Sequence, residues 1–159
     1  LHAEEIASAS DRLSCFVMGT SDLVKDMHAQ HTAMRLPVLT GLSLSILAAR
    51  AYGLRVLDGV YLDLADEEGF AASCQQGLEL GFDGKTLIHP AQIEVTNQVF
   101  APSNGELDLA RRQIAAFEEI QRVGQGVAVV DGNIVENLHA DRAKQLLYKA
   151  NLIAELTMG

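Results

Sequence analysis

The sequence is short of cysteine, of basic residues and of long apolar runs. Its only two cysteines, Cys15 and Cys74, lie among apolar or small residues. This predicts no disulfide framework and a reducing compartment, the cytoplasm or, in a eukaryote, the mitochondrial matrix. Lys and Arg number 12 against 21 Asp and Glu, for a net charge of −9, which argues against nucleic acid or an anionic membrane surface as a partner. No run approaches the roughly 18 apolar residues of a membrane span.

An initiator methionine is also missing. The chain begins at Leu1, and residues 2–9 read as the middle of a helix with no capping residue ahead of them. We therefore expect a piece of a longer protein. The 159 residues are 48% hydrophobic, and a chain of this length can bury about 68–70% of its unfolded surface. The composition predicts a well-packed globular unit.

Three strand-then-helix units are predicted along the first 100 residues. The expected strands are residues 13–18, 55–62 and 86–89, and the expected helices are residues 40–52, 67–80 and 93–100. Strands that alternate with helices over short connections indicate a parallel sheet with right-handed crossovers. The fold class is therefore α/β.

Two α/β architectures fit this pattern. An open doubly wound sheet could be complete at this size, but it usually places its ligand loop early in the chain. A complete (β/α)8 barrel needs about 250 residues, so the favoured interpretation is the last three units of such a barrel, about strands six to eight, over residues 1–102. The outer strands would then lack partners, and the chain alone should be sticky or unstable.

The pattern changes after Pro102, and residues 103–159 form a predicted C-terminal appendage. Ser103 is expected to cap a helix with an apolar stripe, and a hairpin over residues 126–135 has Asp131-Gly132 as its turn. A final helix is expected over residues 137–156. The appendage is thus a helix–hairpin–helix.

Polar residues that follow the predicted strands are candidates for a site, because barrels place their chemistry at the carboxyl ends of strands. Asp22 follows the first strand and could bind Mg²⁺, or it could simply begin the next helix. His89 and Pro90 end the third strand. Proline fixes His89 in an extended conformation, which suits either a group at the mouth of the site or a histidine bonded to backbone.

Other polar residues are interpreted as structural or as weaker candidates. Lys85 precedes the third strand, so it is expected to be solvated and to lie opposite the active face. Asp63 could point into the site, whereas Asp66 is expected to cap the next helix. His28 and His31 have the i,i+3 spacing of a zinc pair, but no second ligand pair follows, so a polar surface is favoured.

Four segments together are similar to one known family. They are GTSDL (19–23), AARAYGLRVLDGVYLDLADEEGF (48–70), GFDGKTLIHPAQIEVTNQVFAPS (81–103) and GVAVVDGNIVENLHADRAK (126–144). They resemble the citrate lyase β-subunit-like branch of the HpcH/HpaI aldolase superfamily, which includes malyl-CoA and citramalyl-CoA lyases. The GKTLIHPAQI and DGVY segments are the most specific to that branch.

The resemblance implies a TIM barrel with a C-terminal appendage, assembled as a homotrimer or homohexamer. It implies a magnesium-dependent lyase that cleaves or forms the C–C bond of a 3-hydroxyacyl-CoA through an acyl-CoA enolate, with glyoxylate or pyruvate as the oxo-acid. By the same resemblance Asp22 is a metal ligand, and His89 and Pro90 line the mouth of the site. Glu136, in the appendage, is implied to be the general acid/base in the site of the adjacent subunit. The family's second metal ligand and its arginine have no counterpart here, so residues 1–159 alone should be inactive.

Two alternatives to the lyase remain open at this point. A malyl-CoA thioesterase could use the same scaffold, with water attacking the thioester while the C–C bond survives. A non-catalytic paralogue could use the appendage only to contact partners. The segments present do not separate these alternatives.

Overall fold

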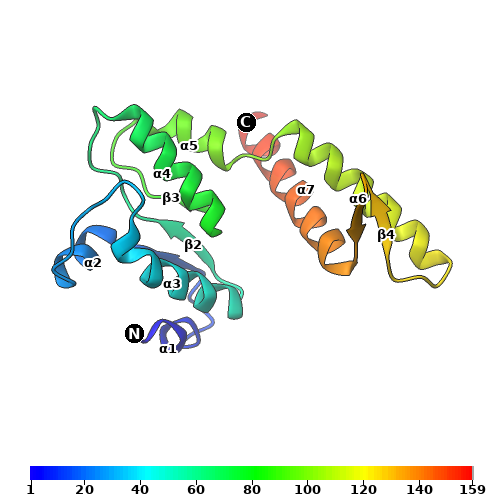
Figure 1. Cartoon of the computed structure of the whole chain (residues 1–159), viewed down its shortest axis with the longest axis horizontal. Coiled ribbons are helices and arrows are strands. Elements are labelled where there is room, and N and C mark those ends of the chain that lie inside the picture. Colours follow the sequence, from blue (N-terminus) through cyan, green and yellow to red (C-terminus); the bar gives the residue numbers. More distant parts are fainter. Residues whose placement is uncertain (159) are drawn as a thin grey trace. The chain divides into compact units, whose positions relative to one another are not determined.

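The computed structural model describes residues 1–158, which divide into two units after residue 100 (Figure 1). Each unit has its own hydrophobic core. The boundary follows Phe100, the last residue of a helix.

A three-stranded parallel sheet is the centre of the first unit. Its strands are β1 (Cys15–Val17), β2 (Arg55–Asp58) and β3 (Gly84–Lys85), in the order β1-β2-β3. Phe16 pairs with Val56, and Asp58 pairs with Lys85. All three carboxyl ends therefore lie at one edge of the sheet, which confirms the predicted α/β class.

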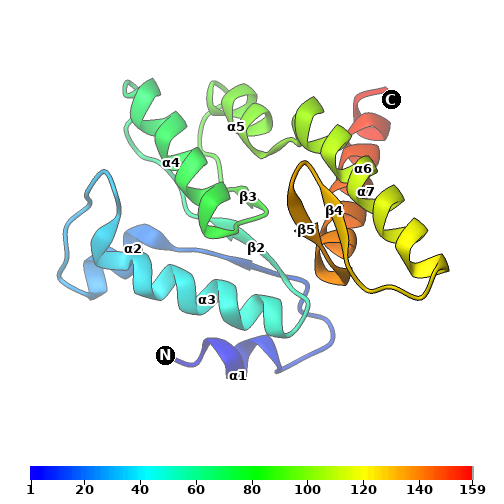
Figure 2. The ribbon, with the colours of Figure 1, turned by 45° about the vertical axis from the view of Figure 1, so that its right-hand side comes forward.

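Helices connect and cover these strands, as the alternating pattern predicts. Helices α2 (Thr20–Asp26), η1 (Leu36–Val38) and α3 (Leu39–Ala51) lie between β1 and β2, and α4 (Glu67–Leu80) lies between β2 and β3. Helix α5 (Gln92–Phe100) follows β3, and the short α1 (Ala3–Ala7) lies against α3 (Figure 2). Helix α3 packs on β1 and β2, whereas α4 and α5 pack on β3 and on each other.

Helix α4 shows how local sequence sets an element's bounds. The Asp66 side chain caps its start by accepting a hydrogen bond from the Gly69 amide. The helix ends at Gly81, whose φ of 103° is a left-handed conformation that glycine adopts without steric cost. The predicted range of 67–80 and the predicted cap are both confirmed.

The strands are shorter than the sequence predicts, and the third was predicted at the wrong place. Strand β3 is Gly84–Lys85 rather than residues 86–89. The Thr86 amide still donates to the Asp58 carbonyl oxygen, but the Ile88 amide turns to the Gln92 side chain. The Gln92 side chain, from α5, thus takes the place of the neighbouring strand as the hydrogen-bond partner of the Ile88 amide, and the pairing between β2 and β3 ends before this residue.

The core of the first unit lies where α3, α4 and α5 meet the sheet. Its fully buried members are apolar or sulfur-containing, and they are Leu42, Ala49, Val56 and Cys74. Burying each side chain of leucine or valine size contributes about 1.5–3 kcal/mol. This packing fixes the positions of β2 and α4, which carry side chains of the candidate site.

The second unit is a helix, a hairpin and a second helix. Helix α6 (Asn104–Arg122) precedes β4 (Ala128–Val130) and β5 (Asn133–Val135), and α7 (Asn137–Met158) ends the described chain. The predicted Asp131-Gly132 turn is present, with φ of 51° and 79° at its two residues. Positive φ at both positions is typical of a type I′ turn.

The core of this unit is small and lies between the helices and one face of the hairpin. It consists of Phe117, Ala128, Val130, Val135 and Ala140. Within residues 1–158, the structure contains no helix that is both long and apolar enough to cross a membrane.

Candidate functional site

The carboxyl ends of β1 and β2 are held unusually close to each other. A Cβ atom at Gly59 would collide with the Thr20 side chain and would lie 2.9 Å from the Met18 carbonyl oxygen. Only glycine therefore permits the chain leaving β2 to pass this near to the chain leaving β1. The segments that follow both strands are brought together at one edge, where α/β proteins usually bind ligands.

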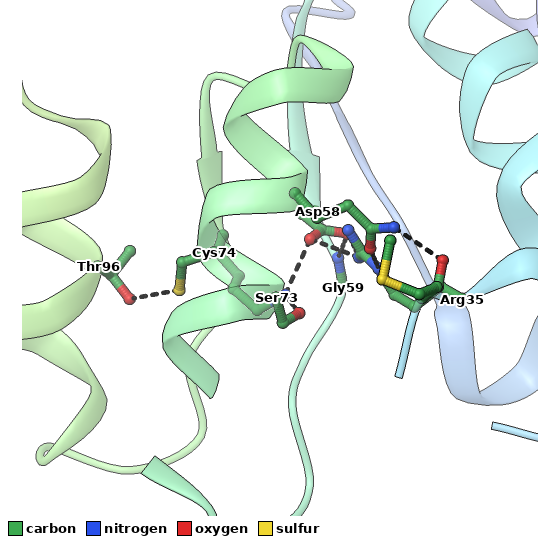
Figure 3. A network of polar contacts seen from close by, with 9 residues as sticks. Arg35, Asp58, Gly59, Ser73, Cys74 and Thr96 are labelled. Carbon is green, nitrogen blue, oxygen red and sulfur yellow. Dashed lines mark hydrogen bonds and ion pairs between the residues drawn. The ribbon is translucent and has the colours of Figure 1, made fainter. Parts of the chain in front are cut away.

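A buried cluster of three charged side chains lies at this edge (Figure 3). The Asp58 carboxylate has no solvent-exposed surface. It accepts a hydrogen bond from Lys85 Nζ at 2.8 Å and bonds from Arg35 Nη1 to both oxygens at 2.7 Å. One carboxylate thus balances two cations, and the cluster carries a net charge of +1.

Helix α4 leaves space for the Asp58 side chain because it has a glycine at position 77. The Asp58 Oδ2 atom would lie 2.9 Å from a Cβ atom at Gly77, so a side chain at that position would press on the carboxylate. The Gly59 amide also donates to Asp58 Oδ1 at 2.8 Å. Three donor groups, which make four hydrogen bonds, thus satisfy the buried carboxylate, as a buried charge requires.

Arg35 reaches the cluster from the loop between α2 and α3. Its φ of 52° places the residue in the left-handed region. Its Nε donates to Gln76 Oε1 at 2.6 Å, and Gln76 Nε2 donates back to the Met34 carbonyl oxygen at 2.7 Å. The loop is thereby fastened to α4 and to β2 through one guanidinium group.

Lys85 contradicts its prediction, because it is neither solvated nor remote from this edge. Its side chain is 1% exposed, and its Nζ also donates to Ser73 Oγ at 3.1 Å. Burial lowers the pKa of Lys85 below its usual range, and the Asp58 charge opposes part of that shift. Lys85 lies in β3 itself, and the register that pairs it with Asp58 sets the contact.

A cavity of about 500 Å³ lies beside this cluster within the first unit. Its walls come from α2, the loop of residues 30–38, the segment that follows β2, and α4. Arg35 and Ser73 from the cluster region both line it. Ligand pockets are commonly about 300–1,000 Å³, so the cavity is large enough for a small-molecule site.

Acidic and phenolic groups lie near the outer part of the same cavity. The Tyr61 hydroxyl donates to Asp66 Oδ2 at 2.6 Å. This bond is the largest of the effects that raise the pKa of Tyr61 to about 12, and it lowers the pKa of Asp66. Asp63 is exposed and accepts a hydrogen bond from the Ala65 amide. Both carboxylates therefore also have local structural tasks.

Asp22 lies in the first turn of α2, directly after β1, as the sequence predicts. Its side chain is exposed and makes no hydrogen bond or ion pair with the described part of the chain. It does not line the cavity beside Arg35. The carboxylate is thus at the predicted edge and free to bind an ion from solvent.

His89 and Pro90 lie in the exposed turn between β3 and α5. His89 Nδ1 accepts a hydrogen bond from the Ala91 amide at 3.2 Å, and its carbonyl oxygen accepts one from the Gln92 amide. This matches the alternative of a histidine bonded to backbone. Neither residue lines the cavity, and their role at a mouth stays a prediction.

Glu136 belongs to the second unit, where it directly precedes α7. Its side chain is exposed, and its amide donates to His139 Nδ1 at 3.1 Å. Its carbonyl oxygen accepts from the amides of His139 and Ala140. The backbone of Glu136 therefore begins the helix, and its carboxylate is left to solvent.

The two histidines of the α2–α3 loop do not form a metal site in the structure. His28 has a φ of 52°, and both His28 and His31 are exposed. Among residues 1–158 there is no group of three His, Cys, Asp or Glu side chains that could hold a metal ion. Both side chains therefore lie on the surface of the loop.

Comparison with known proteins identifies the family. The family profile described as HpcH/HpaI aldolase/citrate lyase matches residues 1–90. The chain belongs to the HpcH/HpaI aldolase/citrate lyase family. The matched range includes β1, β2, β3 and the whole charge cluster, so the fold of the first unit is that of the family.

Individual relatives extend the similarity across both units. A (3S)-malyl-CoA thioesterase of Cereibacter sphaeroides is 60% identical over 154 residues, which are 97% of this chain and 54% of that protein. The citrate lyase subunit beta of Escherichia coli K12 is 37% identical over 94% of this chain and 50% of its own length. The chain thus spans about half the length of the curated relatives it matches.

Solved structures agree with this assignment. The CitE protein of Mycobacterium tuberculosis, in complex with magnesium, acetoacetate and coenzyme A, superposes with a TM-score of 0.74 and 29% identity. The match covers 94% of this chain and 56% of that protein. A citrate lyase from Burkholderia xenovorans, at 23% identity and a TM-score of 0.79, supports the fold alone.

Proposed function

We propose that the protein containing this chain hydrolyses the thioester of (3S)-malyl-CoA or a closely similar CoA ester. The observation that carries the proposal is the 60% identity to a (3S)-malyl-CoA thioesterase over 97% of the chain. The citrate lyase beta subunits match at only 36–38% identity. The relatives therefore favour the thioesterase over the C–C lyase that the resemblance of the four segments implies.

We also propose magnesium as the cofactor, with Asp22 as one of its ligands. An exposed carboxylate that has no partner among the described residues 1–158 suits a cation that prefers oxygen ligands. Magnesium usually keeps several waters and uses one or two carboxylates, together with oxygens of the substrate. Asp22 alone can thus be this chain's contribution. The CitE structure of Mycobacterium tuberculosis contains magnesium and coenzyme A, which supports the choice.

The proposed reaction breaks the bond between the acyl carbon and the sulfur of CoA. Water adds to the thioester carbonyl, the CoA thiolate leaves, and the acid is released with its C–C bonds intact. A bound magnesium ion would supply a Lewis acid for the oxygen charge that develops. The chain's own groups would hold substrate and move protons, with Glu136 as the proposed base for the attacking water and His89 and Pro90 at the mouth.

The architecture and assembly proposals follow from the same family membership. We propose that the three-stranded sheet is about strands six to eight of a (β/α)8 barrel, that residues 103–159 are its appendage, and that the protein forms homotrimers or homohexamers. Strands in the order β1-β2-β3, parallel and joined by helices, support the first of these proposals.

A C–C lyase is the second candidate, because the citrate lyase beta subunits are also similar to the chain. The products separate the two activities. The natural protein, given (3S)-malyl-CoA and Mg²⁺, should release free CoA and malate. Acetyl-CoA and glyoxylate as the main products would replace the thioesterase proposal with the lyase.

The role of Asp22 can be tested in the same assay. Asp22→Asn should weaken the apparent affinity for Mg²⁺ at least about tenfold. Removing a residue that hydrogen-bonds to a metal ligand already lowers metal affinity by about that factor, and removing the ligand itself should lower it no less. Asp26→Asn, at the other end of α2, is the matched control and should leave the magnesium dependence unchanged. Equal magnesium curves for both variants would remove Asp22 from the metal site.

A further inference from the structure

The Gln92 side chain joins two loops at the carboxyl edge of the sheet. Gln92 is the first residue of α5 and is only 5% exposed. Its Oε1 atom accepts from the Ile88 amide at 3.0 Å, and its Nε2 atom donates to the Tyr61 carbonyl oxygen at 3.1 Å. Ile88 follows β3, and Tyr61 follows β2. One buried amide group therefore fixes the loop after β3 against the loop after β2.

The two ends of this side chain have different tasks. Ile88 offers a backbone donor and Tyr61 offers a backbone acceptor, so the residue between them must supply one acceptor and one donor. The side-chain amide of glutamine has both. Methionine has a similar length and makes neither bond well, whereas asparagine has the amide but is one methylene group shorter. The bridge between the loops thus depends on the chemistry and the length of Gln92.

His89 is held on both sides by bonds to this one residue. The amide of the preceding Ile88 goes to the Gln92 side chain, and the His89 carbonyl oxygen accepts from the Gln92 amide at 3.1 Å. Gln92 is in turn attached to its surroundings. Its carbonyl oxygen accepts from Thr96 Oγ1 at 2.8 Å, and Thr96 Oγ1 lies 3.8 Å from Cys74 Sγ on α4 (Figure 3). The backbone of His89 therefore has a fixed position at the edge.

This position decides which ring nitrogen of His89 carries its proton. Nδ1 accepts from the Ala91 amide at 3.2 Å, so Nδ1 has no hydrogen in this arrangement. The proton of the neutral ring is then on Nε2, because the bond made by one ring nitrogen sets the state of the other. His89 is exposed, and its Nε2 atom has no hydrogen-bond partner among residues 1–158. The turn thus presents an N–H donor to solvent.

We infer that Gln92 is a positioning residue, which keeps the His89 proton on Nε2 so that this N–H donates to an acceptor oxygen of the substrate. The substrate part of the inference rests on the proposed function, because malyl-CoA has carbonyl and carboxylate oxygens. Gln92 acts through His89 and does not itself touch the substrate. Without the Gln92 amide group the turn relaxes, the bond from Ala91 to Nδ1 is lost, and the ring populates both tautomers.

The tautomer can be measured without any substrate. In the natural protein labelled with ¹⁵N-histidine, NMR should show His89 with its proton on Nε2. Gln92→Met should convert this signal to a mixture of the two tautomers. Gln98→Met is the matched control, because Gln98 lies in the same helix and its amide bonds the exposed Glu94 side chain. His139, whose Nδ1 also accepts from a backbone amide, is an internal reference that should stay unchanged.

A second variant serves if Gln92→Met does not fold. Gln92→Asn keeps an amide group but is too short to reach both partners at once, so it should give the same mixture of tautomers. A parent-like His89 signal in either variant, with a parent-like circular dichroism spectrum, would overturn the inference.

Turnover distinguishes a positioning residue from one that only supports the fold. Gln92→Met and His89→Ala should each raise KM for malyl-CoA about fivefold, the usual worth of one hydrogen bond, with kcat unchanged. If Gln92 acts through His89, the double variant should have the same KM as His89→Ala alone. Effects that multiply in the double variant would overturn the inference. A changed His89 signal with an unchanged KM would overturn the contact with the substrate.

The two measurements separate this inference from the proposed function. A His89 signal that depends on Gln92, together with no release of CoA from malyl-CoA by the parent, would support the positioning role and refute the thioesterase. Release of CoA together with a His89 signal that ignores Gln92 would refute the positioning role alone.

Discussion

Single residues decide how this edge of the sheet is held together, and Asp58 has the largest role. Its carboxylate is the only acid bonded to the buried Lys85 ammonium group and to the Arg35 guanidinium group within residues 1–158. Breaking a buried ion pair by removing one partner is costly, because the other charge stays buried without compensation. Both cations would be stranded by the loss of one side chain.

Asp58→Asn should therefore lower the free energy of unfolding by about 3–5 kcal/mol. The substitution keeps the size of the side chain and removes only its charge. Chemical denaturation followed by circular dichroism measures the change. Asp108→Asn is the control, because Asp108 pairs with Arg112 on the exposed surface of α6, where ion pairs contribute little. A parent-like denaturation midpoint for Asp58→Asn would contradict the view that the cluster holds the edge together.

The sequence suggests the contact between Asp58 and Lys85 but not the contribution of Arg35. Asp58 lies in the apolar run RVLDGVYL, and Lys85 lies between Gly84 and an apolar segment. A charged residue in a buried strand needs a partner, so opposite charges in two neighbouring strands suggest a pair. Arg35 could not be found this way, because its contact depends on a left-handed loop conformation rather than on strand register.

Among the elements, helices were predicted far better than strands. Asp66 and Gly81 define α4 through their own side-chain and backbone chemistry, so its range of 67–80 was correct. Strand ends depend on partners that sequence does not show. The placement of β3 at Gly84–Lys85 follows from its pairing with β2 and from the Gln92 side chain that takes the Ile88 amide.

Helix α6 carries the clearest prediction at the scale of elements. The Ser103 side chain accepts from the Glu106 amide, and the Glu106 carboxylate accepts from the Ser103 hydroxyl and amide. These bonds lower the pKa of Glu106, and the bond from the Ser103 hydroxyl has the largest effect. Because the pKa of Glu106 is lower in the folded state, its ionised carboxylate stabilises the fold. This contribution is fully present above the unfolded pKa of about 4.3, and it is lost as the pH falls through the lower pKa of the folded state.

Glu106→Gln keeps the size and hydrogen-bonding shape of the capping group and removes its charge. The variant should be less stable than the parent by a few tenths of a kcal/mol at pH 7, and the difference should vanish below the lowered pKa of Glu106. Urea denaturation at several pH values measures this. Glu118→Gln, in the same helix, provides the comparison for a general loss of charge. A difference that persists in strong acid would show that the carboxylate's charge is not involved.

The whole molecule exposes more surface than its size requires. Its accessible area is 10662 Å², whereas two separate compact domains of these lengths would together expose about 9,300 Å². Many large apolar side chains are exposed. Leu36, Leu44 and Leu47 are 68%, 48% and 67% exposed, and the two leucines of α3 line a hollow of about 1040 Å³ in the first unit. Exposed apolar patches of this kind mark surfaces that associate.

We therefore predict that residues 1–159 self-associate through this face of α3. Leu47→Gln should weaken the association about tenfold, because the interface would lose roughly the free energy of partly burying one leucine side chain. Stability should stay within about 0.5 kcal/mol of the parent, because the side chain is already exposed. Sedimentation velocity over a concentration series measures both the parent and the variant. Leu156→Gln, in the second unit and 83% exposed, is the matched control. A parent that stays monomeric throughout, or a Leu156→Gln variant that dissociates equally, would show that the α3 face is not the surface responsible.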